Sequence, residues 1–213
     1  MNLSVVIPCY NEAENIPILI KKILDTYKPQ TEIIFVNNGS TDNTKELLLK
    51  EIALTGNSSF RVVNIDKNIG YGHGIMSGLM ESNGEIMSWT HADLQTDIND
   101  VYLGYNKLIE HSNKKKTFLK GNRRKRFIFD NLLTWGMGKI ASTFFGYNFK
   151  DINAQPKMFH KSFLNLVNES PDDFSLDLYF YFIALKENIK ILELPVYFND
   201  RLYGEAKGGG GSS

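Results

Sequence analysis

Four short segments rich in amide, hydroxyl and carboxylate side chains are the parts of this sequence best suited to chemistry. Each follows an apolar run, and they are residues 8–12 (PCYNE), 37–42 (NNGSTD), 66–68 (DKN) and 91–95 (HADLQ). Side chains of these types bind metal ions or hydrogen-bond to ligands. Turn formation and helix capping explain the second segment well, because Asn and Gly tolerate positive φ and Ser, Thr or Asp caps a helix. They explain Asp93 poorly, so we interpret Asp93 as a candidate metal ligand.

The apolar runs before these segments predict parallel strands. Residues 3–7, 32–36, 61–65 and 85–89 are short and rich in β-branched side chains, as buried strands are. Helical spacing fills the intervals, at residues 12–27, 43–54 and 72–81. This alternation predicts a doubly wound α/β fold with a mostly parallel central sheet and helices on both faces. In such sheets ligands bind beyond the carboxyl ends of the strands, where the four polar segments fall.

Composition narrows the class of protein. The chain has 213 residues, of which 42% are hydrophobic, enough for one globular domain with a sizeable core. Its 24 basic and 24 acidic residues balance, so nucleic acid is not an expected partner. The single cysteine, Cys9, cannot form an internal disulfide, which fits a reducing compartment. No apolar run reaches membrane-spanning length. We therefore expect a cytoplasmic protein, or one peripheral on the cytoplasmic face of a membrane.

Taken in order, residues 6–12, 36–42, 68–70 and 92–95 resemble the family 2 glycosyltransferases of GT-A fold. The resemblance continues at residues 121–123, 151, 155–157, 174–177 and 201–207, and so covers nearly the whole chain. Within the family it is strongest to the dolichyl- and polyprenyl-phosphate sugar synthases and related surface-polysaccharide transferases. The resemblance implies an inverting enzyme that moves a sugar from a nucleotide-diphosphate sugar, of UDP or GDP type, to a lipid-phosphate or glycan acceptor.

The resemblance also implies a domain organisation. It predicts one GT-A domain over residues 1–207, with a nucleotide-binding half at residues 1–97 and an acceptor half at residues 98–207. Residues 208–213 are rich in Gly and Ser, so we expect a flexible tail, either a native loop or an added linker.

A divalent cation, Mg²⁺ or Mn²⁺, is the implied cofactor. The last aspartate of the family's Asp-any-Asp motif, to which the resemblance assigns the metal, falls on Asp93. Such a cation neutralises charge on a departing diphosphate and needs few protein carboxylates. His91 stands where the family has the first aspartate. Its imidazole either ligates the metal or contacts ribose or water, and we favour ribose or water.

The donor-binding residues implied by the resemblance come from the four polar segments and from the end of the chain. They are Pro8, Tyr10, Glu12, Asn38, Asp66, Asn68, His91, Ala92, Arg201 and Lys207. Asn37 and Asn38 stand where the family commonly has one or two aspartates. Asparagine still accepts a hydrogen bond through its carbonyl, but without the charge-assisted strength that a carboxylate gives to a bond with a base N–H. Packing at a strand end explains Tyr10 as well as a pocket does.

Asp177 is the leading candidate on the acceptor side. It begins an apolar helix, where a carboxylate either suits the helix dipole or, as the resemblance implies, lies at the reaction centre. It would act as a general base towards a hydroxyl acceptor, or orient groups around a lipid phosphate, which is already anionic. The implied sugar and acceptor pocket contains Gln95, Arg123, Asp151, Gln155 and Lys157, although fold stabilisation explains the last three nearly as well.

Two further patterns have weaker implications. Basic clusters at residues 114–116 and 123–126 adjoin an apolar helix predicted at residues 127–145, which favours peripheral membrane contact through residues 123–145 and ordinary solvated charge about equally. The glycine-rich residues 70–74 follow the third strand and lack dinucleotide-binding spacing, so we expect a tight turn into a helix. Two functions of different class remain, an active glycosyltransferase and a catalytically weakened nucleotide-sugar or lipid-binding module, and we favour the enzyme.

Overall fold

The computed structural model describes residues 1–124, 140 and 142–198. The strands are β1 (Leu3–Cys9), β2 (Thr31–Asn38), β3 (Phe60–Ile65), β4 (Ile86–Trp89), β5 (Thr117–Arg124), β6 (Lys157–His160) and β7 (Lys190–Tyr197). The α-helices are α1 (Ile16–Thr26), α2 (Thr44–Thr55), α3 (Tyr71–Met80), α4 (Ile98–Ile109) and α6 (Leu176–Lys186), with 3₁₀ turns η1 (Lys114–Lys116) and η2 (Lys161–Leu166).

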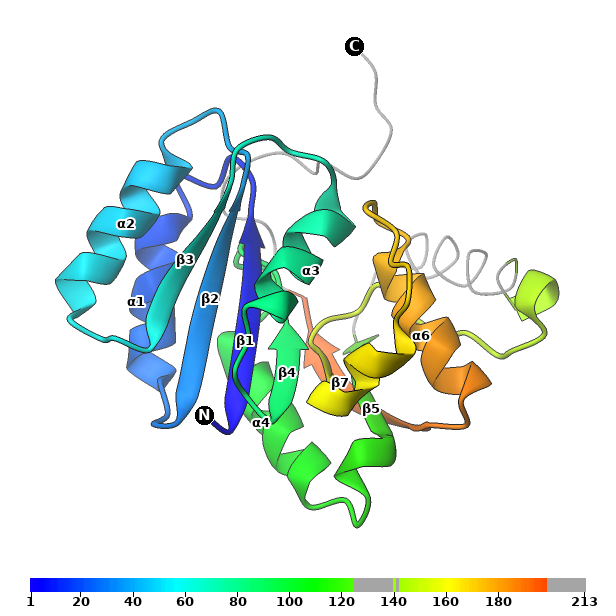
Figure 1. Cartoon of the computed structure of the whole chain (residues 1–213). Coiled ribbons are helices and arrows are strands. Elements are labelled where there is room, and N and C mark those ends of the chain that lie inside the picture. The colour runs from blue at the N-terminus through cyan, green and yellow to red at the C-terminus, as the bar shows by residue number, and fades with distance from the viewer. Residues whose placement is uncertain (125–139, 141, 199–213) are drawn as a thin grey trace.

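One sheet runs through the described residues, in the order β3-β2-β1-β4-β6-β5-β7. Strand β6 pairs antiparallel with β4 and β5, and the other pairings are parallel. The strand order reverses between β1 and β4, and such a switch point opens a crevice at the carboxyl ends of the strands. Figure 1 shows these ends at the top of the molecule. The predicted doubly wound, mostly parallel sheet is confirmed.

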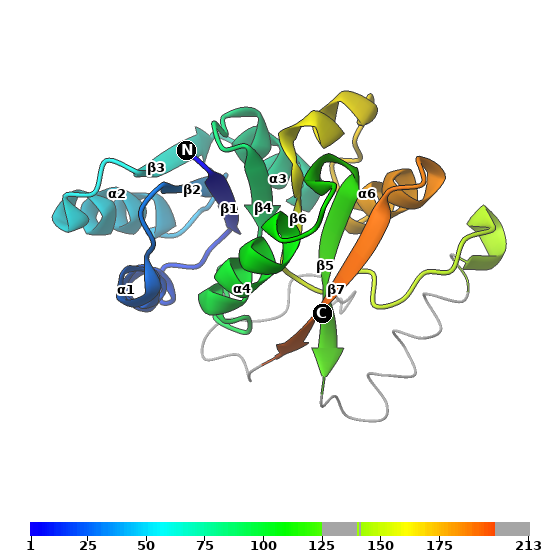
Figure 2. The ribbon, with the colours of Figure 1, turned by 90° about the horizontal axis from the view of Figure 1, so that it is seen from below.

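Helices cover both faces of the sheet because the strands bury side chains on both. Val5 and Ile7 pack with α1, α2 and α4 in one core, whereas Val6 packs with α3 and α6 in another. Adjacent residues of a strand point to opposite faces, so β1 contributes to both cores. Figure 2 shows α1 and α4 on one side of the sheet and α3 and α6 on the other. A strand buried on both faces reads as a continuous apolar run, which is the pattern of residues 3–7.

Local hydrogen bonds fix where helices α4 and α1 begin. Asp97 caps α4, and its side chain accepts a hydrogen bond from the amide of Asn99. Helix α1 begins at Ile16 and not at residue 12, because residues 12–15 form a turn in which the carbonyl of Glu12 accepts the amides of Asn15 and Ile16. The predicted bounds of this helix were therefore wrong by one turn.

Candidate active site

The ends of the first three strands bring the predicted donor-binding segments together. Pairing places Cys9 beside Asn37 and Asn37 beside Asn64, so the polar segments that follow lie at one edge of the sheet. Six of the residues predicted to bind the donor lie here: Pro8 and Asn38 on β1 and β2, Tyr10 and Glu12 after β1, and Asp66 and Asn68 after β3. Arg201 and Lys207 lie outside the described residues.

Close packing holds these loops in place. A Cβ on Gly39, whose φ is +67°, would lie 2.2 Å from the backbone nitrogen of Asn68. The Asn38 amide donates to the carbonyl of Gly70 at 2.9 Å. Its buried Oδ1 has no hydrogen-bond partner within the described part of the chain.

Asp93 lies in a turn that core packing fixes from both sides. Its neighbours Ala92 and Leu94 are buried in the α4-side core, and Leu94 adopts the left-handed conformation with φ of 61°. One carboxylate oxygen of Asp93 accepts the amide of Gln95 at 3.1 Å. The side chain is 8% exposed, so it is anchored at the crevice between β1 and β4.

His91 connects the metal motif with the acceptor side. Its ring stacks on that of Tyr71, with centroids 6.1 Å apart. Burial lowers the pKa of His91, and the negative charges of Asp93 and Asp177 oppose that shift only in part. The imidazole is therefore neutral at pH 7 and is able to hydrogen-bond or ligate a metal. Both carboxylates are close enough to act on this one ring.

Asp177 is held by side chains that precede and begin β6. It lies in the first turn of α6, is 3% exposed, and its Oδ1 accepts Lys157 Nζ at 2.6 Å and Gln155 Nε2 at 2.9 Å. Lys157 also donates to the carbonyl of Ile152 at 2.7 Å. Burial lowers the pKa of Lys157, while the charge of Asp177 opposes the shift. The structure thus joins Asp177, predicted at the reaction centre, with two of the residues predicted for the sugar and acceptor pocket.

Arg123 and Asp151 form a second pair at the same edge. The Arg123 backbone nitrogen and Nε each donate to the Asp151 carboxylate at 2.7 Å, and Nη2 donates to it as well. Burial alone would raise the pKa of Asp151, but these hydrogen bonds and the guanidinium charge lower it below its usual range. Asp151 stays ionised and fixes the direction of Arg123. Gln155 and Pro156 precede β6, which begins at Lys157.

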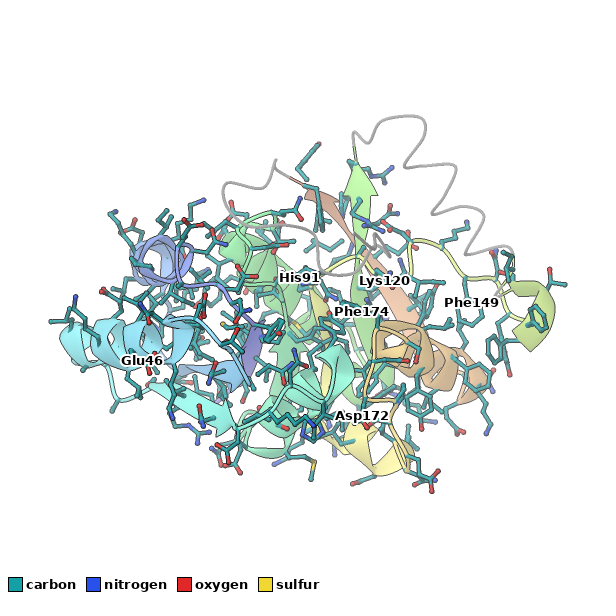
Figure 3. All side chains as sticks on the ribbon, turned by 90° about the horizontal axis from the view of Figure 1, so that it is seen from above. Glu46, His91, Lys120, Phe149, Asp172 and Phe174 are labelled. Atoms are coloured by element: carbon teal, nitrogen blue, oxygen red, sulfur yellow. The ribbon has the colours of Figure 1, made fainter. Side chains whose placement is uncertain are left out.

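Lys120 is a buried cation that sequence reasoning missed. It is fully buried on β5, and Nζ donates to the Gly121 carbonyl at 3.1 Å and lies 3.6 Å from Glu193 of β7. Burial, with a smaller contribution from the nearby charge of Lys157, lowers its pKa to about 8. The signal was present, because Phe118 and Lys120 alternate onto the same face of a strand. Figure 3 looks down on the carboxyl ends, with Lys120, His91 and Phe174 near the middle.

This donor set suits a metal whose remaining ligands come from substrate. The described residues contain no group of three or more His, Cys, Asp or Glu side chains placed to hold an ion. Asp93 offers a hard carboxylate, and His91 lies near it. Mg²⁺ and Mn²⁺ accept such sparse protein ligation when phosphate oxygens and water complete the shell. The residues present fit a divalent cation that binds together with a diphosphate.

The family model described as "Glycosyl transferase family 2" matches residues 4–167, which include the β1–β4 crevice and Asp93. The chain belongs to glycosyl transferase family 2. This membership agrees with the resemblance seen in the ordered motifs. The model match ends before Asp177, so the role of that residue has to be argued from its surroundings.

Curated relatives fall in two groups. The chain is 26% identical to a dolichyl-phosphate beta-glucosyltransferase of Saccharomyces cerevisiae over 227 residues, covering 93% of this chain and 67% of the relative. It is 33% identical to an undecaprenyl-phosphate 4-deoxy-4-formamido-L-arabinose transferase of Photorhabdus laumondii over 102 residues, covering 46% of this chain and 31% of that protein. The chain therefore matches about two thirds of the first relative and under a third of the second.

Solved structures share the fold. Glucosyl-3-phosphoglycerate synthase of Mycobacterium tuberculosis, in complex with Mn²⁺, UDP and its product, superposes with a TM-score of 0.73 at 15% identity, covering 96% of this chain and 73% of that one. A mannosyltransferase of Pyrobaculum calidifontis with GDP-Man and Mn²⁺ gives 0.73 at 19% identity, covering 97% and 58%. At such identities the likeness supports the GT-A architecture alone.

Proposed function

We propose that this protein is an inverting, metal-dependent glycosyltransferase that moves a sugar from a nucleotide-diphosphate sugar to the phosphate of a lipid-linked acceptor. The observation that carries the proposal is that contacts link Asp177 to the turn of Asp93 at the switch point of the sheet. Gln155 Nε2 donates to both Asp177 and Tyr71, and the Tyr71 ring stacks on that of His91. One carboxylate comes from the nucleotide-binding half and the other from the acceptor half. The relatives' names, which specify dolichyl- and undecaprenyl-phosphate, support the same reading.

On the donor side, Asp93 would hold Mg²⁺ or Mn²⁺, which stabilises the negative charge that the departing nucleoside diphosphate develops. The loops after β1, β2 and β3, which carry the predicted donor-binding side chains, would bind the nucleotide. His91, neutral at pH 7, would contact the ribose or a water molecule.

On the acceptor side, the relatives' names favour a lipid phosphate over a hydroxyl. Oδ1 of Asp177 accepts Lys157 and Gln155, so only Oδ2 would be left to act as a general base towards a hydroxyl. A phosphate oxygen is anionic before reaction and needs no base. It would attack the anomeric carbon as the bond from that carbon to the diphosphate breaks, and the nucleoside diphosphate would leave with the bonding electrons. Asp177 would then orient the groups around the acceptor phosphate and would not take a proton.

Location at a membrane surface follows from this acceptor and remains part of the proposal. None of the helices in the described ranges is long and apolar enough to cross a bilayer. The predicted contact segment 123–145 lies mostly outside the described residues. Within it, Ile140, Phe144 and Phe145 are exposed apolar side chains of the kind that enter a lipid interface.

Release of nucleoside diphosphate tests the function. Purified protein would be assayed with UDP-glucose and with GDP-mannose, with Mn²⁺ or with chelator, and with or without a short polyprenyl phosphate. We expect turnover that requires both metal and acceptor, and loss of about 10²-fold or more in Asp93→Ala. Asp25→Ala, which removes an exposed carboxylate on α1, is the matched control. Donor binding without turnover of any donor would indicate the weakened binding module instead.

A further inference from the structure

The glycine-rich residues 70–74 dock the start of α3 against the chain that leads into α6. A Cβ on Gly70 would lie 2.2 Å from the Asp172 carbonyl oxygen, and one on Gly72 would lie 2.2 Å from that of Pro171. The His73 amide donates to the Asp172 carbonyl at 3.0 Å. Only glycine permits so close an approach of two backbones. In Figure 1 the chain before α6 runs beside the upper end of α3. These contacts place Tyr71 where the two halves of the protein meet.

The Tyr71 ring is sandwiched between one aromatic side chain from each half. It stacks on Phe174 with centroids 4.8 Å apart and an interplanar angle of 13°, and on His91 at 6.1 Å and 30°. Figure 3 shows Phe174 and His91 close together over the carboxyl ends of the strands. Phe174 begins the approach to α6, and His91 belongs to the turn that carries Asp93. Stacked rings therefore link the metal motif to the helix that carries Asp177.

The Tyr71 hydroxyl joins the polar groups around Asp177. Gln155 Nε2 donates to Tyr71 Oη at 3.3 Å and to Asp177 Oδ1 at 2.9 Å. Burial raises the pKa of Tyr71, and the charge of Asp177 together with a hydrogen bond to it raises it further. The phenol thus stays protonated and able to donate. Gln155 Oε1 is buried and has no hydrogen-bond partner among the described residues, so the amide is oriented by what its nitrogen contacts.

We propose that Tyr71 is a positioning residue for glycosyl transfer, with its hydroxyl orienting Asp177 and Gln155 and its ring holding His91 in register with them. The inference rests on the proposed function. Tyr71 acts through its neighbours and need not touch substrate. This proposal also gives a role to the glycines of residues 70–74. They allow residues 171–173 to approach closely, which places Phe174 against the Tyr71 ring.

Packing alone is the competing explanation, and Tyr71→Phe separates the two. This substitution keeps the ring and both stacking contacts but removes the hydroxyl. Removing a hydrogen bond to a charged group, when that bond helps to stabilise the transition state, changes the rate by about ten- to hundredfold. We expect kcat with UDP-glucose or GDP-mannose, Mn²⁺ and polyprenyl phosphate to fall by that factor. The donor KM should stay within about twofold, because the loops after β1, β2 and β3 are unchanged.

Phe174 supplies a second variant. Phe174→Leu removes the ring that stacks on Tyr71 and should lower kcat. Phe174→Tyr keeps an aromatic ring there and should leave kcat close to the wild-type value. Tyr179→Phe is the matched control, since Tyr179 lies on α6, packs against Phe180 and is outside the network described above. Thermal melting shows whether each variant is folded at the assay temperature. For a chain of this length, the loss of one ordinary hydrogen bond lowers Tm by about 2–4 °C.

The outcomes are distinct. Reduced kcat in Tyr71→Phe at unchanged donor KM, with normal activity in Tyr179→Phe, supports the proposal. Unchanged kcat in Tyr71→Phe, whatever its Tm, overturns the positioning role and leaves the proposed function intact. A donor KM that rises in step with the loss of rate also overturns it, since Tyr71 would then serve donor binding. Absence of turnover by the wild-type protein with both donors overturns the proposed function and this inference with it.

Discussion

The buried pair of Lys157 and Asp177 predicts a large loss of stability when only one partner is removed. In Lys157→Met the ammonium that lies 2.6 Å from Asp177 disappears, and the Ile152 carbonyl loses its donor at 2.7 Å. The carboxylate, only 3% exposed, retains Gln155 but loses its counter-charge. Uncompensated buried charge of this kind costs about 3–5 kcal/mol. For a chain of this length that corresponds to a fall in Tm of roughly 6–20 °C.

Urea unfolding at pH 7.5 measures this effect through a double-mutant cycle. Asp177→Asn combined with Lys157→Met removes both charges, and we expect the pair to recover at least about 1.5 kcal/mol relative to Lys157→Met alone. Lys190→Met makes the same chemical change at an exposed position of β7 and should stay within about 0.5 kcal/mol of wild type. A loss below about 1 kcal/mol in Lys157→Met, or a double variant no more stable than the single one, would refute the reasoning.

Three further predictions concern stability. Lys120 has a pKa of about 8 in the folded protein and its ordinary, higher value when unfolded, so the unfolded state holds more protons above pH 8 and stability rises with pH. In urea titrations we expect the free energy of unfolding to rise by about 2 kcal/mol between pH 8 and 9.5, and Lys120→Met to lack this contribution. Equal dependence of the unfolding free energy on pH in wild type and Lys120→Met would contradict the prediction. Gly78→Ala places a Cβ 2.4 Å from Val6 Cγ1 and should cost about 1–3 kcal/mol in thermal melts, whereas an unchanged Tm would show that the sheet yields. Asp97→Ala removes the cap that accepts the Asn99 amide and should cost about 1 kcal/mol, with Asp97→Asn, which keeps an acceptor, close to wild type.

Residues 1–97 were predictable because their signals are local. Strands β1 and β2 contain continuous apolar runs, β3 is interrupted by Arg61 and Asn64, and all four strands were predicted within a few residues of their observed bounds. Parallel strands covered by helices on both faces require such runs, so sequence pattern and tertiary environment agree. The ends of the strands then place the polar segments without further information.

Residues 98–198 were less predictable because the order of their strands depends on long-range pairing. Strand β6 inserts antiparallel between β4 and β5, and no local pattern specifies those neighbours. From the sequence alone, Lys120 would be expected at the surface, because its counter-charge is not apparent. The pairing of β5 with β7 brings Glu193 beside Lys120 and supplies that counter-charge. The partner of Asp177 was unknown for the same reason, because Lys157 lies twenty residues away in sequence.

Charge balance at the carboxyl edge supports the proposal of a divalent cation at Asp93. The cations that lie largely buried there, Lys120, Arg123 and Lys157, are each matched by a carboxylate, namely Glu193, Asp151 and Asp177. A diphosphate brings further negative charge and meets another carboxylate at Asp93. Coulomb repulsion between two unit charges 4 Å apart reaches about 4 kcal/mol at the effective dielectric of such a site. The three cations are already neutralised by their carboxylate partners, so they offer no net positive charge to a diphosphate. A divalent cation at Asp93 would make the net charge there positive, and donor binding should therefore require it.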